Sequence, residues 1–128
     1  MRLLLDTHIA LWAITDNPRL PPRARELILA PENEIYISAA SVWEIAIKHA
    51  LGRQTIPISG EEARRYFAAA GYIALPITDR HAAATETLPP LHADPFDRIL
   101  VAQALAEPLK LLTHDAMVAR YSDSILLV

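Results

Sequence analysis

The sequence has no cysteine and only three glycines among 128 residues. Without thiols the chain can form no disulfide, thiolate zinc site, iron–sulfur cluster or cysteine nucleophile, so any metal must be held by oxygen or imidazole. The few glycines leave no GxxxxGK[ST] or GxGxxG loop, and the GxSxG and HExxH motifs are also absent. Nucleotide-loop, serine-hydrolase and zincin-type chemistry are therefore excluded.

Long uncharged apolar runs are missing as well. The apolar N-terminal stretch is interrupted by Asp6 and His8, which is unlike a secretion signal or a membrane span. We therefore expect a cytoplasmic protein without membrane contact. A hydrophobic content of 52% and a mean hydropathy of +0.19 favour an ordered chain. The length predicts one domain over residues 1–128.

Short β-type runs alternate with runs of helical periodicity along the chain. Strands are expected over residues 2–6, 34–38, 72–77, 109–113 and 124–128. Helices are expected over residues 7–14, 21–30, 41–52, 59–71, 78–88, 94–107 and 114–121. This alternation predicts right-handed crossovers and an α/β fold, with a central, mostly parallel sheet of about five strands covered by helices.

Four carboxylates fall where this topology would bring them together. Asp6 ends the first strand and Asp115 closely follows the fourth, and ligands of open parallel sheets bind at the carboxyl ends of strands. Glu44 and Asp97 are expected in the first turns of their helices, with side chains directed toward the helix N-termini. Converging carboxylates repel each other unless cations lie among them, and an all-oxygen set suits Mg²⁺ or Mn²⁺.

Each acid also has a structural interpretation. Ser41 and Glu44 have the spacing of a capping box, and Asp97 stands three residues after Asp94 in a second possible box. Asp94 is better explained as an N-cap than as a metal ligand. Asp6 would suit a turn, and Asp115 the first turn of a helix. Only the combination of the four acids favours a metal site.

Four segments, "LLLDTHIALW", "ISAASVWEIAIK", "DPFDRILVAQA" and "LLTHD", together resemble the motifs of PIN-domain ribonucleases, specifically the VapC-type toxins of bacterial toxin–antitoxin pairs. They occur in the expected order over nearly the whole chain. The resemblance implies a PIN-like α/β/α sandwich whose metal site is formed by Asp6, Glu44, Asp97 and Asp115. It also implies orienting roles for Thr113 and Thr7, and it leaves the role of Asp94 open.

The implied activity is Mg²⁺-dependent hydrolysis of RNA phosphodiester bonds, with Mn²⁺ as a second possible ion. The resemblance further implies a toxin inhibited by a small antitoxin, and a homodimer that pairs through helices of the N-terminal half. Two rivals stay open: a non-catalytic PIN-like RNA-binding or assembly module, and a metal-dependent nuclease of DNA or flap structures. The full set of acids speaks against the first, and the short chain without a clamp region against the second.

The formal charge of −3 is unusual for a nucleic-acid enzyme. Setting the four site acids aside leaves 11 of 15 acidic residues against 12 Lys and Arg, so the remaining surface is near neutral. Arg98, beside Asp97, is expected nearest the site, and the other candidate phosphate contacts are Arg19, Arg23, Arg25, Lys48, Arg53, Arg64 and Arg65. The histidines share no metal-ligand spacing, and Trp12 and Trp43 are expected in the core.

Overall fold

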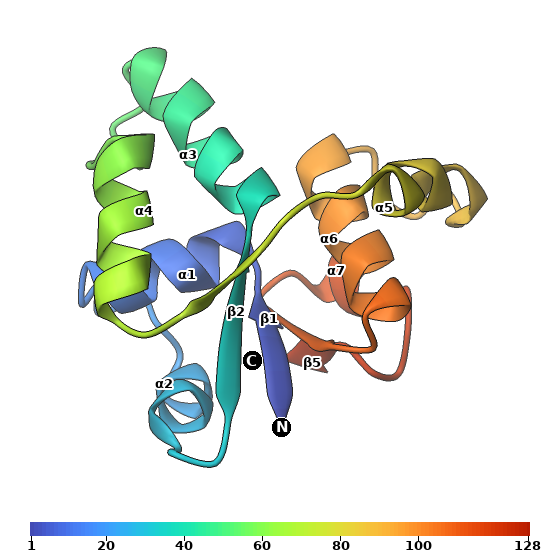
Figure 1. Cartoon of the computed structure of the whole chain (residues 1–128), viewed down its shortest axis with the longest axis horizontal. Coiled ribbons are helices and arrows are strands. Elements are labelled where there is room, and N and C mark those ends of the chain that lie inside the picture. Colours follow the sequence, from blue (N-terminus) through green and yellow to red (C-terminus); the bar gives the residue numbers. More distant parts are fainter.

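The computed structural model describes all residues, 1–128, and is built around a five-stranded sheet (Figure 1). Every pair of neighbouring strands is parallel, and the strand order is β3-β2-β1-β4-β5. The strands are β1 (Arg2–Leu5), β2 (Glu34–Ser38), β3 (Ile73–Leu75), β4 (Lys110–Thr113) and β5 (Leu126–Leu127). The predicted parallel α/β sheet is thus confirmed. Its edge strands β3 and β5 are shorter than predicted, since each has a pairing partner on one side only.

Helices cover both faces of the sheet (Figure 1). They are α1 (Thr7–Ile14), α2 (Pro22–Leu29), α3 (Ala39–Ala50), α4 (Gly60–Ala69), α5 (Asp79–Ala84), α6 (Pro95–Ala106) and α7 (Ala116–Ala119). The helix predicted over residues 78–88 is divided, because a 3₁₀ turn, η1 (Thr85–Thr87), follows α5. No helix combines the length and the apolar character needed to cross a membrane.

Two apolar cores lie on opposite sides of the sheet. Along β1, Leu3 and Leu5 face the core that is completed by α1, α2 and α4, whereas Leu4 faces the core under α6 and α7. This alternation follows from the two-residue period of a strand. Because both faces are covered, most residues of the central strands are buried, and the exposed ones are at their amino ends.

The carboxyl ends of the central strands lie at one edge of the sheet. Leu5 of β1 pairs with Leu112 of β4, so Asp6 and Thr113 follow at the same level. The Asp6 N–H donates to the Leu112 carbonyl oxygen over 3.0 Å, which extends the ladder by one bond. Helices α1, α3 and α7 all begin at this edge, where a parallel sheet normally binds ligands (Figure 1).

Helix α3 begins two residues earlier than predicted. Ser38, the last residue of β2, is its N-cap and accepts a hydrogen bond from Ala40 N over 3.0 Å. The predicted capping box of Ser41 and Glu44 is therefore wrong, and so is the placement of Glu44 in the first turn. The cause is that β2 runs directly into α3 without a loop, so the capping serine is the earlier one.

Candidate metal centre at the carboxyl edge of the sheet

Asp6 lies at the centre of the carboxyl edge and is 7% exposed. One carboxylate oxygen caps α1 by accepting from Ile9 N over 2.9 Å, and the other accepts from the Thr113 hydroxyl over 2.6 Å. The same hydroxyl accepts a hydrogen bond from Asp115 N over 3.0 Å. Thr113 therefore orients two of the four predicted site acids at once.

Thr7 joins the same edge from α1. Its hydroxyl donates to the hydroxyl of Ser41 over 3.0 Å, and both residues are buried. Ser41 lies on α3 one turn before Glu44. Thr7 thus holds together the beginnings of α1 and α3, the helix that carries Glu44.

Asp97 and Asp115 meet at the ring of His92. His92 Nε2 lies 3.0 Å from Asp97 Oδ2 and 3.3 Å from Asp115 Oδ2. Asp94 N donates to His92 Nδ1 over 3.3 Å, so in the neutral ring the hydrogen is on Nε2 and points at the carboxylates. Each of the three residues offers one ligand atom, and these atoms lie within 4.8 Å of one another.

His92 is the site residue that sequence reasoning missed. The histidines were judged by their spacing from one another, and no such spacing exists. The available signal was the position of His92 in the loop that leads into α6, five residues before Asp97. A residue in such a loop can lie beside the first turn of the helix that follows.

Asp94 is the N-cap of α6, as predicted. Its Oδ1 accepts from Phe96 N over 2.8 Å and from Asp97 N over 3.2 Å. The reciprocal bond of a capping box does not form, because Asp94 N donates to His92 and the Asp97 carboxylate faces the histidine. Capping by Asp94 therefore leaves Asp97 available to the site.

Glu44 reaches the cluster from the second turn of α3 and is 3% exposed. Its Oε2 forms an ion pair with Lys48 one turn later on the same helix. Its Oε1 is buried and has no hydrogen-bond partner. A buried, unpartnered carboxylate oxygen is costly, and an additional cation beside it would remove that cost.

Burial raises the pKa values of two of these acids, and the closeness of other acids adds to the rise in one of them. Burial, followed by the charges of Asp94, Asp6 and Glu44, raises the pKa of Asp97 from 3.8 to about 7, and His92 opposes the rise. Burial likewise raises the pKa of Asp6. Because the folded-state pKa of Asp97 lies above the unfolded value, the free energy of unfolding falls as pH rises from about 4 to about 7.

These features fit a hard divalent cation. The candidate ligands are carboxylate oxygens with one imidazole beside them, and one buried carboxylate oxygen lacks a partner. Burial together with the charges of neighbouring carboxylates raises the pKa of Asp97 to about 7. Asp6, Glu44, Asp97 and Asp115 are the residues that would hold it. Oxygen ligands of this kind suit Mg²⁺ and Mn²⁺.

Arg98 points away from the cluster. Its guanidinium donates to the carbonyl oxygens of Thr85 (2.8 Å) and Pro89 (3.1 Å) and to the Tyr121 hydroxyl (3.0 Å). Tyr121 in turn accepts from His92 N over 2.9 Å. The structure thus gives Arg98 a place in holding the loop that carries His92, and most of its donors are already used.

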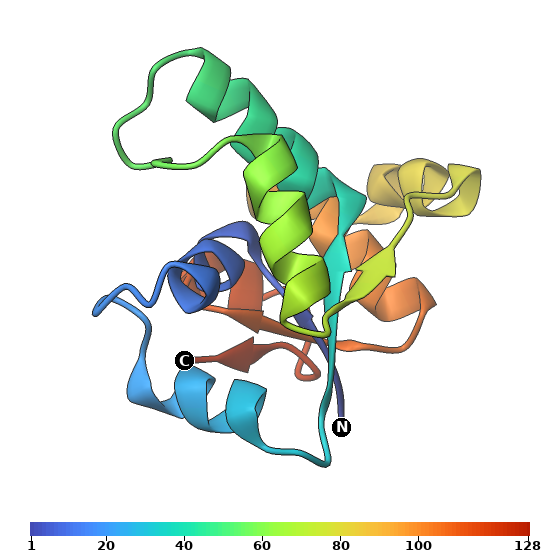
Figure 2. The same cartoon turned by 60° about the vertical axis from the view of Figure 1, so that its left-hand side comes forward.

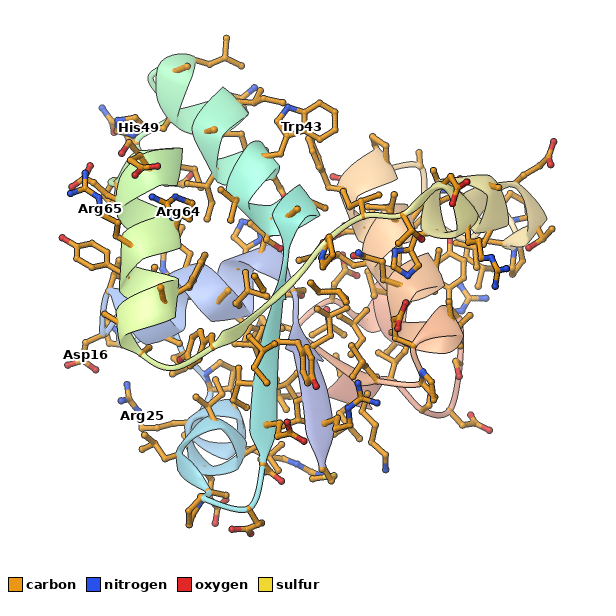
Figure 3. All side chains as sticks on the ribbon, in the orientation of Figure 1. Asp16, Arg25, Trp43, His49, Arg64 and Arg65 are labelled. Atoms are coloured by element: carbon orange, nitrogen blue, oxygen red, sulfur yellow. The ribbon has the colours of Figure 1, made fainter.

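Several of the other cations are paired with acids of the chain. Lys48 binds Glu44, Arg25 lies 3.1 Å from Asp16, and Arg64 binds Glu61 on the side of α4 that faces α3 (Figure 3). The pairs of Arg25 and Arg64 lie at exposed positions, where salt bridges contribute little to stability. Of these cations, Lys48 alone pairs with a predicted site acid.

The two tryptophans differ in burial. Trp12 is half-buried and packs against the core beside α1, whereas Trp43 is 60% exposed, so its prediction as a core residue is wrong. Trp43 projects from the outer side of α3 and contacts Phe96 edge-on, with ring centroids 5.3 Å apart (Figure 3). Helix α3 extends beyond the sheet after its first turns, so its carboxyl-terminal end lies over no strand (Figures 1 and 2).

A parallel sheet of this strand order, with acids converging at its carboxyl edge, defines an α/β protein with a candidate cation site. A sequence model of the PIN domain matches residues 3–123, and the chain therefore belongs to the PIN domain family. No curated protein matches the chain by sequence.

Solved structures with the same fold extend over nearly all of the chain. VapBC2 from Rickettsia felis, bound to a DNA fragment from its promoter, is 20% identical with a TM-score of 0.72 over 100% of this chain and 98% of the other. FitAcB from Neisseria gonorrhoeae is 22% identical with a TM-score of 0.68 over 98% and 96%. A toxin–antitoxin complex from Klebsiella pneumoniae is 19% identical with a TM-score of 0.62 over 97% and 95%.

The raised pKa of Asp97 predicts that divalent ions compete with a proton. Binding of Mg²⁺ or Mn²⁺ should strengthen as pH rises through about 7 and level off above it. Calorimetry in buffers of different ionisation enthalpy should show about one proton released per ion near pH 6, and nearly none near pH 8. Asp97→Asn should abolish this proton release, and a release that does not change with pH would contradict the assignment.

Proposed function

We propose that this protein is a Mg²⁺- or Mn²⁺-dependent endoribonuclease that acts as the toxin of a toxin–antitoxin pair. The observation that carries the proposal is the partly buried cluster of acids, in which buried Glu44 has an unpartnered oxygen and the pKa of Asp97 is raised to about 7. Membership of the PIN family and the VapC-like motifs support nuclease chemistry at this cluster.

Each of the four acids is oriented by contacts within the chain. Asp6 and Asp115 are oriented by Thr113, Asp97 by the turn that Asp94 caps, and Glu44 by the bond between Thr7 and Ser41. A divalent ion held by them would lower the pKa of a water and stabilise charge on the phosphate oxygens. The carboxylates of Asp6, Asp115 and Glu44 accept hydrogen bonds from the chain itself before any ion is bound. Little reorganisation of these side chains is therefore needed when substrate arrives.

The two rival functions differ from this one in observable ways. A non-catalytic RNA-binding or assembly module would tolerate loss of the acids, since it needs no metal. A nuclease of DNA would cleave deoxyribose oligomers at least as fast as RNA of the same sequence. The fold and the acids are common to both nuclease alternatives, so cleavage of matched RNA and DNA separates them.

The proposed partner is a small antitoxin protein. Its support is that three solved structures of the same fold are described as VapBC, FitAcB and toxin–antitoxin complexes. An arginine of the partner would satisfy the acidic cluster through bidentate contacts and so block the ion and the substrate together. We further propose a homodimer, with the possibility of a larger assembly with antitoxin, to which the exposed Trp43 and Leu51 of the α3 region would contribute apolar surface.

Replacing Glu44 by Gln, or Asp97 by Asn, tests the nuclease function. Each change keeps the shape of the side chain and removes one ligand charge, so RNA cleavage in saturating Mg²⁺ should fall by about two orders of magnitude or more. The melting temperature of the metal-free protein should stay equal or rise, because repulsion among the carboxylates is relieved. Cleavage rate and melting temperature are measured on the same preparations.

The matched control is Glu26→Gln, which removes an exposed acid on α2. It should change neither cleavage nor melting temperature. Asp94→Asn should keep most activity, because Asn is about as good an N-cap as Asp. Near-wild-type cleavage by Glu44→Gln and Asp97→Asn would refute the nuclease assignment.

His92 should act as a positioning residue for Asp97 and Asp115. Because its Nε2 hydrogen is shared between the two carboxylates, His92→Ala should weaken Mn²⁺ binding by roughly ten- to a hundredfold. His92→Gln, whose amide can still donate, should recover part of the affinity. Mn²⁺ titration followed by electron paramagnetic resonance measures both. Equal or tighter binding by His92→Ala would mean that the ring only competes with the ion.

The partner proposal predicts dependence on a single cationic side chain. Coexpression with the product of the adjacent reading frame should suppress RNA cleavage, and replacing one arginine of its C-terminal tail by Gln should restore it. Replacing that arginine should also leave the complex assembled, because the rest of the interface is unchanged. If every arginine variant inhibited as well as the unaltered partner, inhibition would operate elsewhere.

A further inference from the structure

An aromatic hollow adjoins the acidic cluster. Its lining includes Asp6 and Asp115 of the cluster and three aromatic residues with no proposed part in holding an ion, which are His8, Trp12 and His114. His8 and Trp12 belong to α1, while His114 lies between β4 and α7. We call the three aromatic side chains the ring trio. The trio and two of the proposed metal ligands thus share one open depression.

The ring trio rests on the apolar core on one side and is exposed to solvent on the other. His8 and Trp12 are one helical turn apart, with ring centroids 5.8 Å apart and planes tilted by 51°. His114 meets Trp12 edge-on at 6.0 Å with an interplanar angle of 69°. Trp12 packs against the core under α1, whereas both imidazoles are exposed. The tryptophan therefore anchors a surface whose outer parts are free to contact a ligand.

His114 is fixed in orientation as well as in place. Its Nδ1 lies 2.6 Å from the backbone oxygen of Val128, which can only accept a hydrogen bond. In the neutral ring Nδ1 therefore carries the hydrogen, and Nε2 is left as an acceptor. A planar group could therefore donate an N–H on its edge to Nε2 of His114 and stack its apolar face on the aromatic rings of the trio.

The charges around the hollow select among ligands. No Lys or Arg lines it, and Asp6 and Asp115 would repel an anion. Among the rings themselves nothing attracts a phosphate group, whose place in the proposed function is at an ion held by the acids. A nucleobase can occupy the hollow, since it is uncharged and planar, and each base in a strand is attached within a few ångströms of a phosphate.

We propose that His8, Trp12 and His114 form a stacking site for the base next to the phosphate that is cleaved. The proposal rests on the proposed nuclease function, because it needs that phosphate at the acidic cluster. Stacking on aromatic side chains tolerates every base. The ring trio would therefore supply affinity and register along the strand more than sequence discrimination.

The test uses Trp12 as its own reporter. The chain has two tryptophans, so Trp43→Phe leaves Trp12 as the sole indole. Single-stranded RNA hexamers are titrated into this variant in Ca²⁺, and the emission of Trp12 is followed. The matched ligand is an abasic ribose-phosphate hexamer of equal charge. Hexamers with bases should quench Trp12 and bind roughly tenfold or more tightly than the abasic chain.

Two further variants locate the site. His8→Ala and His114→Ala should each weaken binding of the base-containing hexamers several-fold and leave binding of the abasic chain unchanged. His49→Ala is the matched control, because His49 is an exposed histidine on α3 whose Nδ1 also bonds a backbone oxygen, that of Ile56 (Figure 3). It should change neither affinity. Equal affinity for both ligands, or no effect of either trio variant, would overturn the proposal.

Cleavage of the same RNA hexamers in Mg²⁺ keeps the two proposals apart. If cleavage occurs, and is lost in Asp97→Asn, while base and abasic chains bind equally, the stacking site alone is refuted. If the hexamers quench Trp12 through their bases but are never cleaved, the nuclease function alone is refuted. Binding and cleavage that both depend on bases support the two together.

Discussion

The hydrogen bond from Thr113 to Asp6 is the contact on which the arrangement of the site depends. Thr113 ends β4 and Asp6 follows β1, so the bond joins the two central strands where the backbone ladder stops. The other oxygen of Asp6 holds the first turn of α1, and the Thr113 hydroxyl also receives the Asp115 N–H. Two strands and two helix starts are thus fixed relative to one carboxylate. Burial of that carboxylate raises its pKa, so the arrangement stores electrostatic free energy that a cation can release.

Capping a helix and binding an ion are compatible tasks at this edge. Asp6, Asp94 and Asp115 are the N-caps of α1, α6 and α7. In both Asp6 and Asp115 one oxygen accepts from backbone N–H groups. The second oxygen of Asp6 accepts from the Thr113 hydroxyl, and that of Asp115 lies 3.3 Å from His92 Nε2. The helix N-termini add a small favourable field for negative charge. Residues that read as simple helix starts therefore also preorganise the cluster.

The fold and the convergence of the four acids could be predicted from the sequence, because strand–helix alternation and the ends of strands are local signals. The role of these acids as metal ligands stays a prediction. Asp6 and Asp115 are placed by the strands they follow. Glu44 was assigned to the wrong turn, since two serines precede it and only the direct passage from β2 into α3 selects Ser38. Trp43 was misplaced because apolar periodicity does not reveal that α3 extends beyond the sheet. His92 depends on how a loop is held by Arg98 and Tyr121, a contact between distant parts of the chain.

The ion pair between Lys48 and Glu44 balances the charge of a buried carboxylate from within the chain. Small metal-dependent domains often stay unfolded until the ion arrives, because their ligands repel each other without it. Here an internal ammonium neutralises the most deeply buried acid of the cluster, so the chain can reach its native shape while metal is scarce. Lys48 contacts one oxygen of Glu44 and leaves the other without a partner. An ion bound at that second oxygen would meet a carboxylate whose charge is already balanced in part, and folding of the chain would then not depend on the supply of the ion.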